Sequence, residues 1–277
     1  MLYSIAKLPP ETQARIRADY MTRTTSMWHT LPRAMLGTSA KIEKSRGVGV
    51  LGAIMYLAPA DAATPRGTTL CPYADKAGCK AGCLNTAGRG RLNTIQLSRI
   101  RKTLALQQYE SQAHAILDAD IVRHVLKARA LGLVPAIRLN GTSDLDFTQV
   151  IARHPDVQFY DYTKVFTRVD RPIPDNYHLT LSYSEANPGY AKNILARVWD
   201  HGGTVQPKAN AAVVFRDAET VAKVRQHGWK GFTPDKIIDG DTHDARFLDP
   251  GPGYIVALTA KGKAKQDQSG FVVDVTP

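Results

Sequence analysis

Short apolar runs recur along the second half of the chain, and each of them ends in a cluster of polar residues. This pattern predicts β-strands followed by polar loops within residues 133–144, 157–164, 177–185, 204–215, 236–241 and 253–262. Helical periodicity lies between several of these strands, at residues 145–153, 188–200 and 217–227. Strands that alternate with helices pair in parallel through βαβ crossovers, so the sequence predicts an α/β fold.

The first half of the chain follows a different pattern. Residues 48–60 form an apolar run that contains a proline near its end, which is consistent with a buried strand. Residues 94–131 predict two helices, and we expect the break near Asp118 and Asp120 because aspartate favours helix caps.

These elements divide the chain into two parts. Residues 1–46 predict a basic N-terminal extension with a helix over 11–22, and residues 47–277 predict one α/β domain. The expected strands, about six to eight, suit a full or partial parallel (β/α) barrel. An open doubly wound sheet is the alternative.

The composition is that of a globular protein. The chain has 277 residues, of which 43% are hydrophobic, so a sizeable core can form without disulfide bonds or structural metal ions. No apolar stretch approaches the roughly 18–20 residues that cross a bilayer. The first residues carry charges and prolines where a secretory signal has its apolar region. We therefore expect a cytoplasmic protein with reduced thiols.

The chain is strongly basic, with a formal net charge of +11 at pH 7. Such a surplus attracts polyanions over a long range. The basic residues are spread along the chain, with local concentrations at 89–102 and 260–265. Nucleic acid is therefore a candidate partner, and solubility is the alternative reason for the charge.

All three cysteines, Cys71, Cys79 and Cys83, lie in the polar, glycine-rich stretch 71–90. Thiolates are soft ligands that suit zinc and iron–sulfur clusters. Three of them can hold one inorganic centre and leave a coordination position open for reaction. The alternative is a closed structural zinc site completed by a histidine, for which the candidates are His29, His114, His124 and His243.

The polar clusters at the strand ends indicate where a site would form. In parallel α/β folds the loops after the strands meet at the carboxyl edge of the sheet. The cysteine stretch follows the first predicted strand, so it would open at this edge. The next predicted strand ends in candidate ligand contacts, for which a plain turn is the alternative: Asn140, Thr142, Ser143 and Asp144.

The strand segment FYDYTK, residues 159–164, carries two further candidates. Alternation along a strand places Tyr160 and Tyr162 on one face and Phe159 on the other. Asp161 and Lys164 are the candidate catalytic residues of this segment.

The segment DGDTHDARFLDP, residues 239–250, is the densest group of ionisable side chains. Its candidate catalytic residues are Asp239, Asp241, His243 and Arg246. Carboxylates and a histidine can hold a hard divalent cation for phosphoester cleavage. The alternative is that Arg246 pairs with an aspartate and braces the loop. Lys208, which precedes an apolar run, is a further candidate for contact with a carboxylate or phosphate.

Several segments together resemble the phage- and plasmid-borne gene product 88 family: CPYADKAGCKAGCLNTAGRG, PAIRLNGTSDLDF, DVQFYDYTK, LTLSYSE and DGDTHDARFLDP. The resemblance covers residues 34–277, and its cysteine and DGD segments are the most specific. It implies a protein encoded by a phage or plasmid and made in a bacterial host. It implies no particular reaction.

The order of a strand, a three-cysteine loop and a partial α/β barrel is similar to that of radical S-adenosylmethionine enzymes. This resemblance implies a [4Fe–4S] cluster on Cys71, Cys79 and Cys83, whose open iron binds the amino and carboxylate groups of S-adenosylmethionine. The spacing departs from the common one, because this chain has gaps of seven and three residues where those enzymes commonly have three and two.

The same resemblance implies further cofactor contacts and a partner. The loop after the next strand would meet the methionine part of the cofactor through Asn140, Gly141, Thr142, Ser143 and Asp144. A later strand end would meet its ribose through Ser182, Ser184 and Glu185. A redox-active cluster also needs an electron donor.

Three functional hypotheses follow. The first is an iron–sulfur enzyme of the radical S-adenosylmethionine type that acts on nucleic acid or a nucleotide. The second is a nucleic-acid-binding phage or plasmid protein with a structural zinc or iron–sulfur knuckle. The third is a metal-dependent nuclease or phosphatase that uses the DGDTHD segment.

Overall fold

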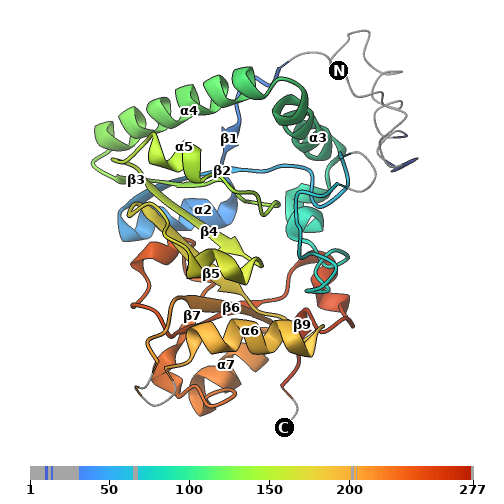
Figure 1. Cartoon of the computed structure of the whole chain (residues 1–277), viewed down its shortest axis with the longest axis vertical. Helices are drawn as coiled ribbons and strands as arrows, with labels where there is room; N and C mark the ends of the chain where they lie inside the picture. Colours follow the sequence, from blue (N-terminus) through green and yellow to red (C-terminus); the bar gives the residue numbers. More distant parts are fainter. Residues whose placement is uncertain are drawn as a thin grey trace.

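The computed structural model describes residues 31–64, 68–200 and 205–275, together with Pro10, Glu11, Ala14 and Gly203. The described residues form a mixed α/β fold around one nine-stranded sheet (Figure 1). The helix predicted over 11–22 lies outside the described residues, apart from Glu11 and Ala14, and so does His29.

The sheet is mostly parallel. Its strand order is β1-β2-β3-β4-β5-β6-β8-β7, and β9 pairs with β6 beside this row. β1 is antiparallel to β2, whereas the other strand pairs of the described sheet are parallel. The strands are β1 (Leu36–Gly37), β2 (Val50–Met55), β3 (Val134–Arg138), β4 (Gln158–Thr163), β5 (Tyr177–Ser182), β6 (Asn210–Phe215), β7 (Ile237–Asp239), β8 (Ile255–Thr259) and β9 (Val272–Val273).

The helices number six in the described residues after position 31. They are α2 (Ala40–Lys44), α3 (Asn93–Gln108), α4 (Glu110–Ala130), α5 (Thr148–Ala152), α6 (Pro188–Val198) and α7 (Ala218–His227). Figure 1 shows α4 and α5 toward one end of the molecule and α6 and α7 toward the other. No helix of the described chain combines the length and the apolar character that crossing a membrane requires.

The crossover helices pack on one face of the sheet. Leu179 and Leu181 of β5 point to the same face, because side chains two residues apart in a strand share a face. Leu179 belongs to a buried cluster with residues of α4 and α5, and Leu181 belongs to one with residues of α6 and α7. We call this the helical face.

The opposite face, which we call the second face, has a different cover. Ile42 of α2 and Ala245 pack there against Tyr160 and Ala136. Phe159 lies instead in the cluster with α4 and α5. The predicted separation of Phe159 from Tyr160 is therefore confirmed.

The sheet is open. β1 and β7 are its two edges, so the strands do not close into a full barrel. From β2 to β6 the order along the sheet follows the order along the chain. A doubly wound sheet reverses its order at a central switch point, and this stretch has no such reversal.

The break between the two long helices was predicted at the wrong place. α3 ends at Gln108 and α4 begins at Glu110, so the break is at Tyr109. Asp120 is buried inside α4, and its carboxylate accepts hydrogen bonds from the backbone N–H groups of Met35 and Leu36. The aspartate therefore caps the backbone around β1 and not its own helix.

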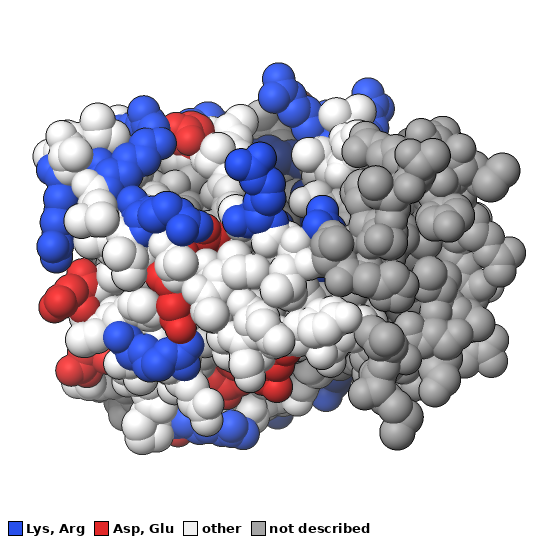
Figure 2. Space-filling model, turned by 90° about the horizontal axis from the view of Figure 1, so that it is seen from above, with Lys and Arg blue, Asp and Glu red and all other residues white. Residues whose placement is uncertain are grey.

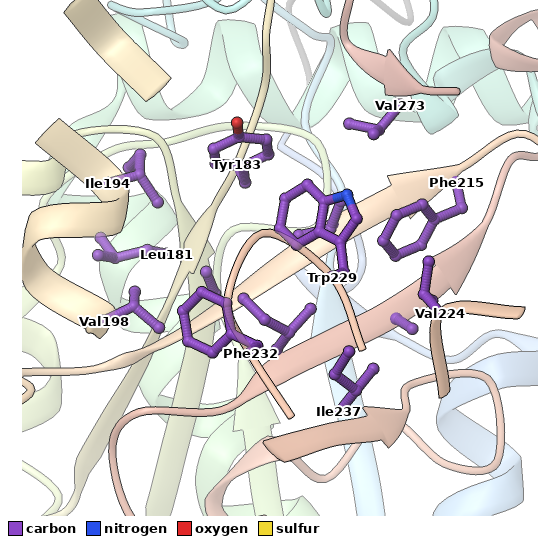
Figure 3. Close-up of a cluster of buried hydrophobic side chains, with 14 of the residues drawn as sticks. Leu181, Tyr183, Ile194, Val198, Phe215, Val224, Trp229, Phe232, Ile237 and Val273 are labelled. Atoms are coloured by element: carbon purple, nitrogen blue, oxygen red, sulfur yellow. The ribbon is translucent and has the colours of Figure 1, made fainter. Parts of the chain in front are cut away.

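A buried aromatic cluster fixes the chain directly after β5 (Figure 3). The ring of Trp229 lies 5.2 Å from that of Tyr183 and 5.5 Å from that of Phe215, in edge-to-face geometry in both cases. Such pairs add to the free energy gained by burial. Because Tyr183 stands between Ser182 and Ser184, this packing holds both serines at the end of the strand.

Candidate functional site

The cysteine loop runs along the carboxyl edge of the sheet, close to residues 141–144 and 184–186. Asp144 donates its backbone N–H to the carbonyl of Leu70, at 2.8 Å. Ser184 donates its hydroxyl to the carbonyl of Ala77 at 2.7 Å, and Ser269 donates to that of Gly78 at 2.9 Å. Three separate loops of this edge therefore hold the cysteine loop in place.

Cys71 and Cys83 each lie close enough to the other cysteines for those thiols to affect their ionisation. Burial raises the pKa of the Cys71 thiol to about 12, and the neighbouring Cys83, Asp144 and Cys79 add to the rise. Burial also raises the pKa of Cys83; Cys79 raises it further, while Lys164 and Arg99 lower it. The sequence prediction that the cysteines gather beside the strand ends agrees with this geometry.

Each thiol makes a hydrogen bond with the backbone of the cysteine loop or of the 140–144 loop. Cys71 donates to the carbonyl of Thr142 at 3.6 Å, and Cys79 donates to that of Ala74 at 3.7 Å. Cys83 accepts from the backbone N–H of Asn85 at 3.5 Å.

Among the residues that the structure describes, no group of three or more histidine, cysteine or acidic side chains is arranged to hold a metal ion. The donor set nevertheless suits an iron–sulfur cluster, because three soft thiols share one region with the cations Lys164 and Arg99. A cubane cluster carries its irons at separate corners, so its thiolate ligands stand farther apart than those of a single zinc ion.

Lys164 and Ser182 form a second polar group at this edge. The ammonium of Lys164 donates to the hydroxyl of Ser182 at 2.8 Å and lies 5.1 Å from the centre of the Phe271 ring. Lys164 also lowers the pKa of Cys83. The structure therefore brings two candidates from different strands beside the cysteines.

Asp144 holds the loops together. It accepts hydrogen bonds from the hydroxyl of Thr163, the backbone N–H of Lys164 and the guanidinium of Arg168, each at 2.8 Å. Through these three donors the carboxylate of Asp144 fixes the backbone at Lys164 and so positions that side chain.

The remaining residues of the 140–144 loop brace it as well. Asn140 donates its backbone N–H to Asp161 at 2.7 Å, and Ser143 donates to the side chain of Asn140 at 2.9 Å. The hydroxyl of Thr142 donates to the carbonyl of Leu57. Burial raises the pKa of Asp161 to about 6, although its hydrogen-bond donors favour the ionised form. Asp161 is thus buried and held by Asn140 and Tyr177.

Gly141 allows this loop to approach β2. Its N–H donates to the carbonyl of Met55 at 3.0 Å, and a Cβ atom would lie 2.7 Å from that same oxygen.

We expect Gly141→Ala to destabilise the fold by about 1–3 kcal/mol, because the backbone oxygen cannot move aside without a cost in free energy. Urea unfolding measures the loss. Gly47→Ala is the control, since a Cβ there meets nothing within 4 Å; equal stability of the two variants would contradict the prediction.

Glu185 and Ser184 differ in accessibility. Ser184 is fully buried and donates to the carbonyls of Ala77 and Gly270. Glu185 is partly exposed and pairs with Lys230 at 3.0 Å. Of these two, only Glu185 retains a side chain open to a ligand at this edge.

The acidic segment 239–250 is held by ion pairs. Its four carboxylates face four different cations: Asp239 pairs with Arg225, Asp241 with Lys261, Asp244 with Lys41 and Asp249 with Arg246. His243 lies 3.2 Å from the guanidinium of Arg246. This arrangement matches the alternative interpretation, in which Arg246 and its neighbours brace the segment.

Lys208 lies apart from the other candidates. It precedes β6, so it stands at the amino edge of the sheet, opposite the edge of the cysteine loop. Its ammonium pairs with Asp170 at 2.6 Å, and Arg197 pairs with the same carboxylate. The structure does not bring Lys208 to the cysteines.

Four residues that the sequence analysis did not select lie on the second face: Arg138, Tyr162, His178 and Thr180. They are buried or half-buried, and Arg138 lies 4.6 Å over the ring of Tyr162. Strand alternation places His178 and Thr180 opposite Leu179 and Leu181, which was the available signal.

Burial, and secondarily Arg246, lowers the pKa of His178 to about 4. An unfolded histidine titrates near 6.5, so between these values the unfolded state binds a proton that the folded state does not. The free energy of unfolding is therefore highest above pH 6.5, as far as His178 affects it. It falls by about 3 kcal/mol as the pH decreases toward 4. We expect the stability difference between wild type and His178→Asn to shrink over this range in urea titrations. A difference that stays constant with pH would contradict this.

Comparison with known proteins decides the family. The family model for gene product 88 matches residues 32–275. The chain belongs to the gene product 88 family. No curated protein and no solved structure matches it. The family membership agrees with the resemblance in the cysteine and DGD segments.

Proposed function

We propose that this gene product 88 family protein is an iron–sulfur enzyme of the radical S-adenosylmethionine type. The observation that carries the proposal is the gathering of Cys71, Cys79 and Cys83 at the carboxyl edge of a sequentially ordered parallel sheet. Three protein ligands leave one iron of a cluster open for S-adenosylmethionine.

The fold supports this proposal at a coarse level. Strands β2 to β6 follow one another in order, and the crossover helices cover one face. An open sheet of this kind supports the proposal of a partial (β/α) barrel. Its carboxyl edge receives the cysteine loop, as a cofactor site in such a fold requires.

The chain's own residues would act by binding and orientation. Cys71, Cys79 and Cys83 would hold a cluster that, when reduced, would supply one-electron chemistry for the cleavage of S-adenosylmethionine. Lys164 and Ser182 stand beside Cys83 and offer an ammonium and a hydroxyl to a carboxylate. Asp144 keeps Lys164 in position, and Glu185 offers acceptor oxygens for ribose hydroxyls.

The experiment is anaerobic purification with iron and sulfide, followed by metal analysis and an absorption spectrum. We expect about four irons per chain and a broad band at the blue edge of the visible spectrum. Reduction in the presence of S-adenosylmethionine should then release 5′-deoxyadenosine. A colourless protein that holds stoichiometric zinc overturns the proposal and favours a structural knuckle.

The charge of the chain, +11, supports nucleic acid or a nucleotide as the substrate class. On the face shown in Figure 2 the basic side chains are interspersed with acidic ones. Binding of single-stranded DNA or RNA should weaken steeply with added salt. If the protein binds neither DNA nor RNA at low salt, nucleic acid is excluded as the substrate class and a small anionic substrate takes its place in the proposal.

A further inference from the structure

The second face of the sheet carries a compact group of polar side chains from neighbouring strands. In the register of the parallel pair β4 and β5, Tyr162 stands beside Thr180 and Tyr160 stands beside His178. The segment around Arg246 covers these strands, since Arg246 is close enough to affect the pKa of both His178 and Tyr162. The side chains therefore share one region between the sheet and this segment.

Polar atoms in this group lack protein partners. Four buried atoms have neither a hydrogen bond nor an ion pair with any residue that the structure describes: Tyr162 Oη, His178 Nε2, Thr180 Oγ1 and Arg246 Nε. More than about 90% of buried polar groups in proteins are paired, and each unpaired one costs about 1–3 kcal/mol. Four in one place mark a region where a bound molecule or ordered water would supply the missing partners.

The chemistry of these atoms defines what they bind. The hydroxyls of Tyr162 and Thr180 and the Nε–H of Arg246 are donors, and His178 Nε2 donates in one tautomer. Burial raises the pKa of Tyr162, so its hydroxyl stays protonated. Converging donors need a molecule rich in acceptor oxygens. One water offers two lone pairs, whereas a carboxylate offers about four acceptor sites.

The surrounding charge favours a negative ligand. Arg246 is fully buried and Arg138 nearly so, and Arg138 stacks on the ring of Tyr162. Their acidic neighbours Asp244 and Asp249 are already engaged in ion pairs, at 3.4 Å with Arg138 and 3.3 Å with Arg246. The Nη atoms of Arg246 face Asp249 and His243, so its Nε–H is the charge-assisted donor left for an oxyanion.

We propose that the second face holds a binding site for an oxyanion, the carboxylate or phosphate group of a small molecule, formed by Tyr162, His178, Thr180 and Arg246. The four polar atoms are themselves buried, while Tyr162 and His178 as whole residues are half-buried. Thr180 lies two residues before Ser182, which is about 7 Å along the strand. A ligand anchored at the site therefore reaches the edge that carries the cysteines, and binding does not require a cluster there.

The test uses the full chain without added metal, at constant ionic strength. Inorganic phosphate and acetate are titrated separately in calorimetry and thermal unfolding, with chloride as the reference salt. We expect saturable binding of at least one of the two oxyanions, with a rise in melting temperature that chloride does not give. Whether phosphate or acetate binds identifies the chemical group that the site recognises.

The variants Thr180→Val and Tyr162→Phe each remove one hydroxyl that has no protein partner, so both should fold. Each should weaken oxyanion binding about tenfold. Thr242→Val makes the same change at an exposed position and should bind like wild type. Absence of saturable binding of either oxyanion, or unchanged affinity in both variants, overturns the site. Neither calorimetry nor thermal unfolding depends on iron content, so these results test the oxyanion site independently of the proposed reaction.

Discussion

Replacing Cys83 with alanine should leave a protein that cannot retain an iron–sulfur cluster, and Cys71→Ala and Cys79→Ala should do the same. The chain has three cysteines in all, so no other thiol can take the vacant position. A cluster held by two thiolates exposes two irons and is lost to solvent and chelators. We expect iron per chain to fall from about four to less than one, with loss of visible absorption, after anaerobic reconstitution and desalting.

The matched control is Ser182→Ala. It lies at the same edge and contacts Lys164, but it offers no soft ligand. It should keep the iron content and the spectrum of wild type while changing the affinity for S-adenosylmethionine.

The cysteine variants should unfold near the wild-type midpoint when metal is absent, because each thiol is only half-buried. Any cysteine variant that retains the full spectrum contradicts the three-thiol centre.

The sequence pattern predicted the sheet well because buried strands have a local cause. The apolar runs of 48–60, 157–164 and 177–185 contain β2, β4 and β5, and the polar residues after them mark the strand ends. Parallel strands buried between two layers read as continuous apolar runs bounded by polar loops. Their positions follow from short segments of the chain.

Features that depend on distant contacts were not predictable. Asp120 looked like a helix cap, yet Met35 and Leu36, far away in the sequence, hold its carboxylate inside α4. Arg246 and Arg138 lie far apart in the chain, and only the folded sheet brings both to Tyr162. The cysteines were the easier part of the site, since their proximity is already present in thirteen residues of sequence, 71–83.

The second large effect expected is on stability, from Asp244→Asn. The carboxylate of Asp244 is 1% exposed and lies 3.2 Å from Lys41 and 3.4 Å from Arg138. Tyr160 donates to it at 3.3 Å. Burial alone would raise the pKa of Asp244, but Lys41 and Arg138 bring it below the ordinary aspartate value. Removing the negative charge leaves Arg138 buried without its main counterion, at a cost of about 3–5 kcal/mol.

Urea unfolding at neutral pH measures this cost as a shift of the midpoint with an unchanged slope. The control is Asp61→Asn, which breaks a pair with Lys80 of even shorter distance, 2.8 Å, but with side chains 49% and 44% exposed. It should cost less than about 1 kcal/mol, because water screens the pair. The gap between wild type and Asp244→Asn should begin to close as the pH falls below about 4, because the unfolded wild-type carboxylate then binds a proton. It closes fully only below the lowered folded-state pKa of Asp244. Equal effects of Asp244→Asn and Asp61→Asn would mean that Arg138 finds another counterion on the second face, and the donors of that face would then be less free to bind an oxyanion.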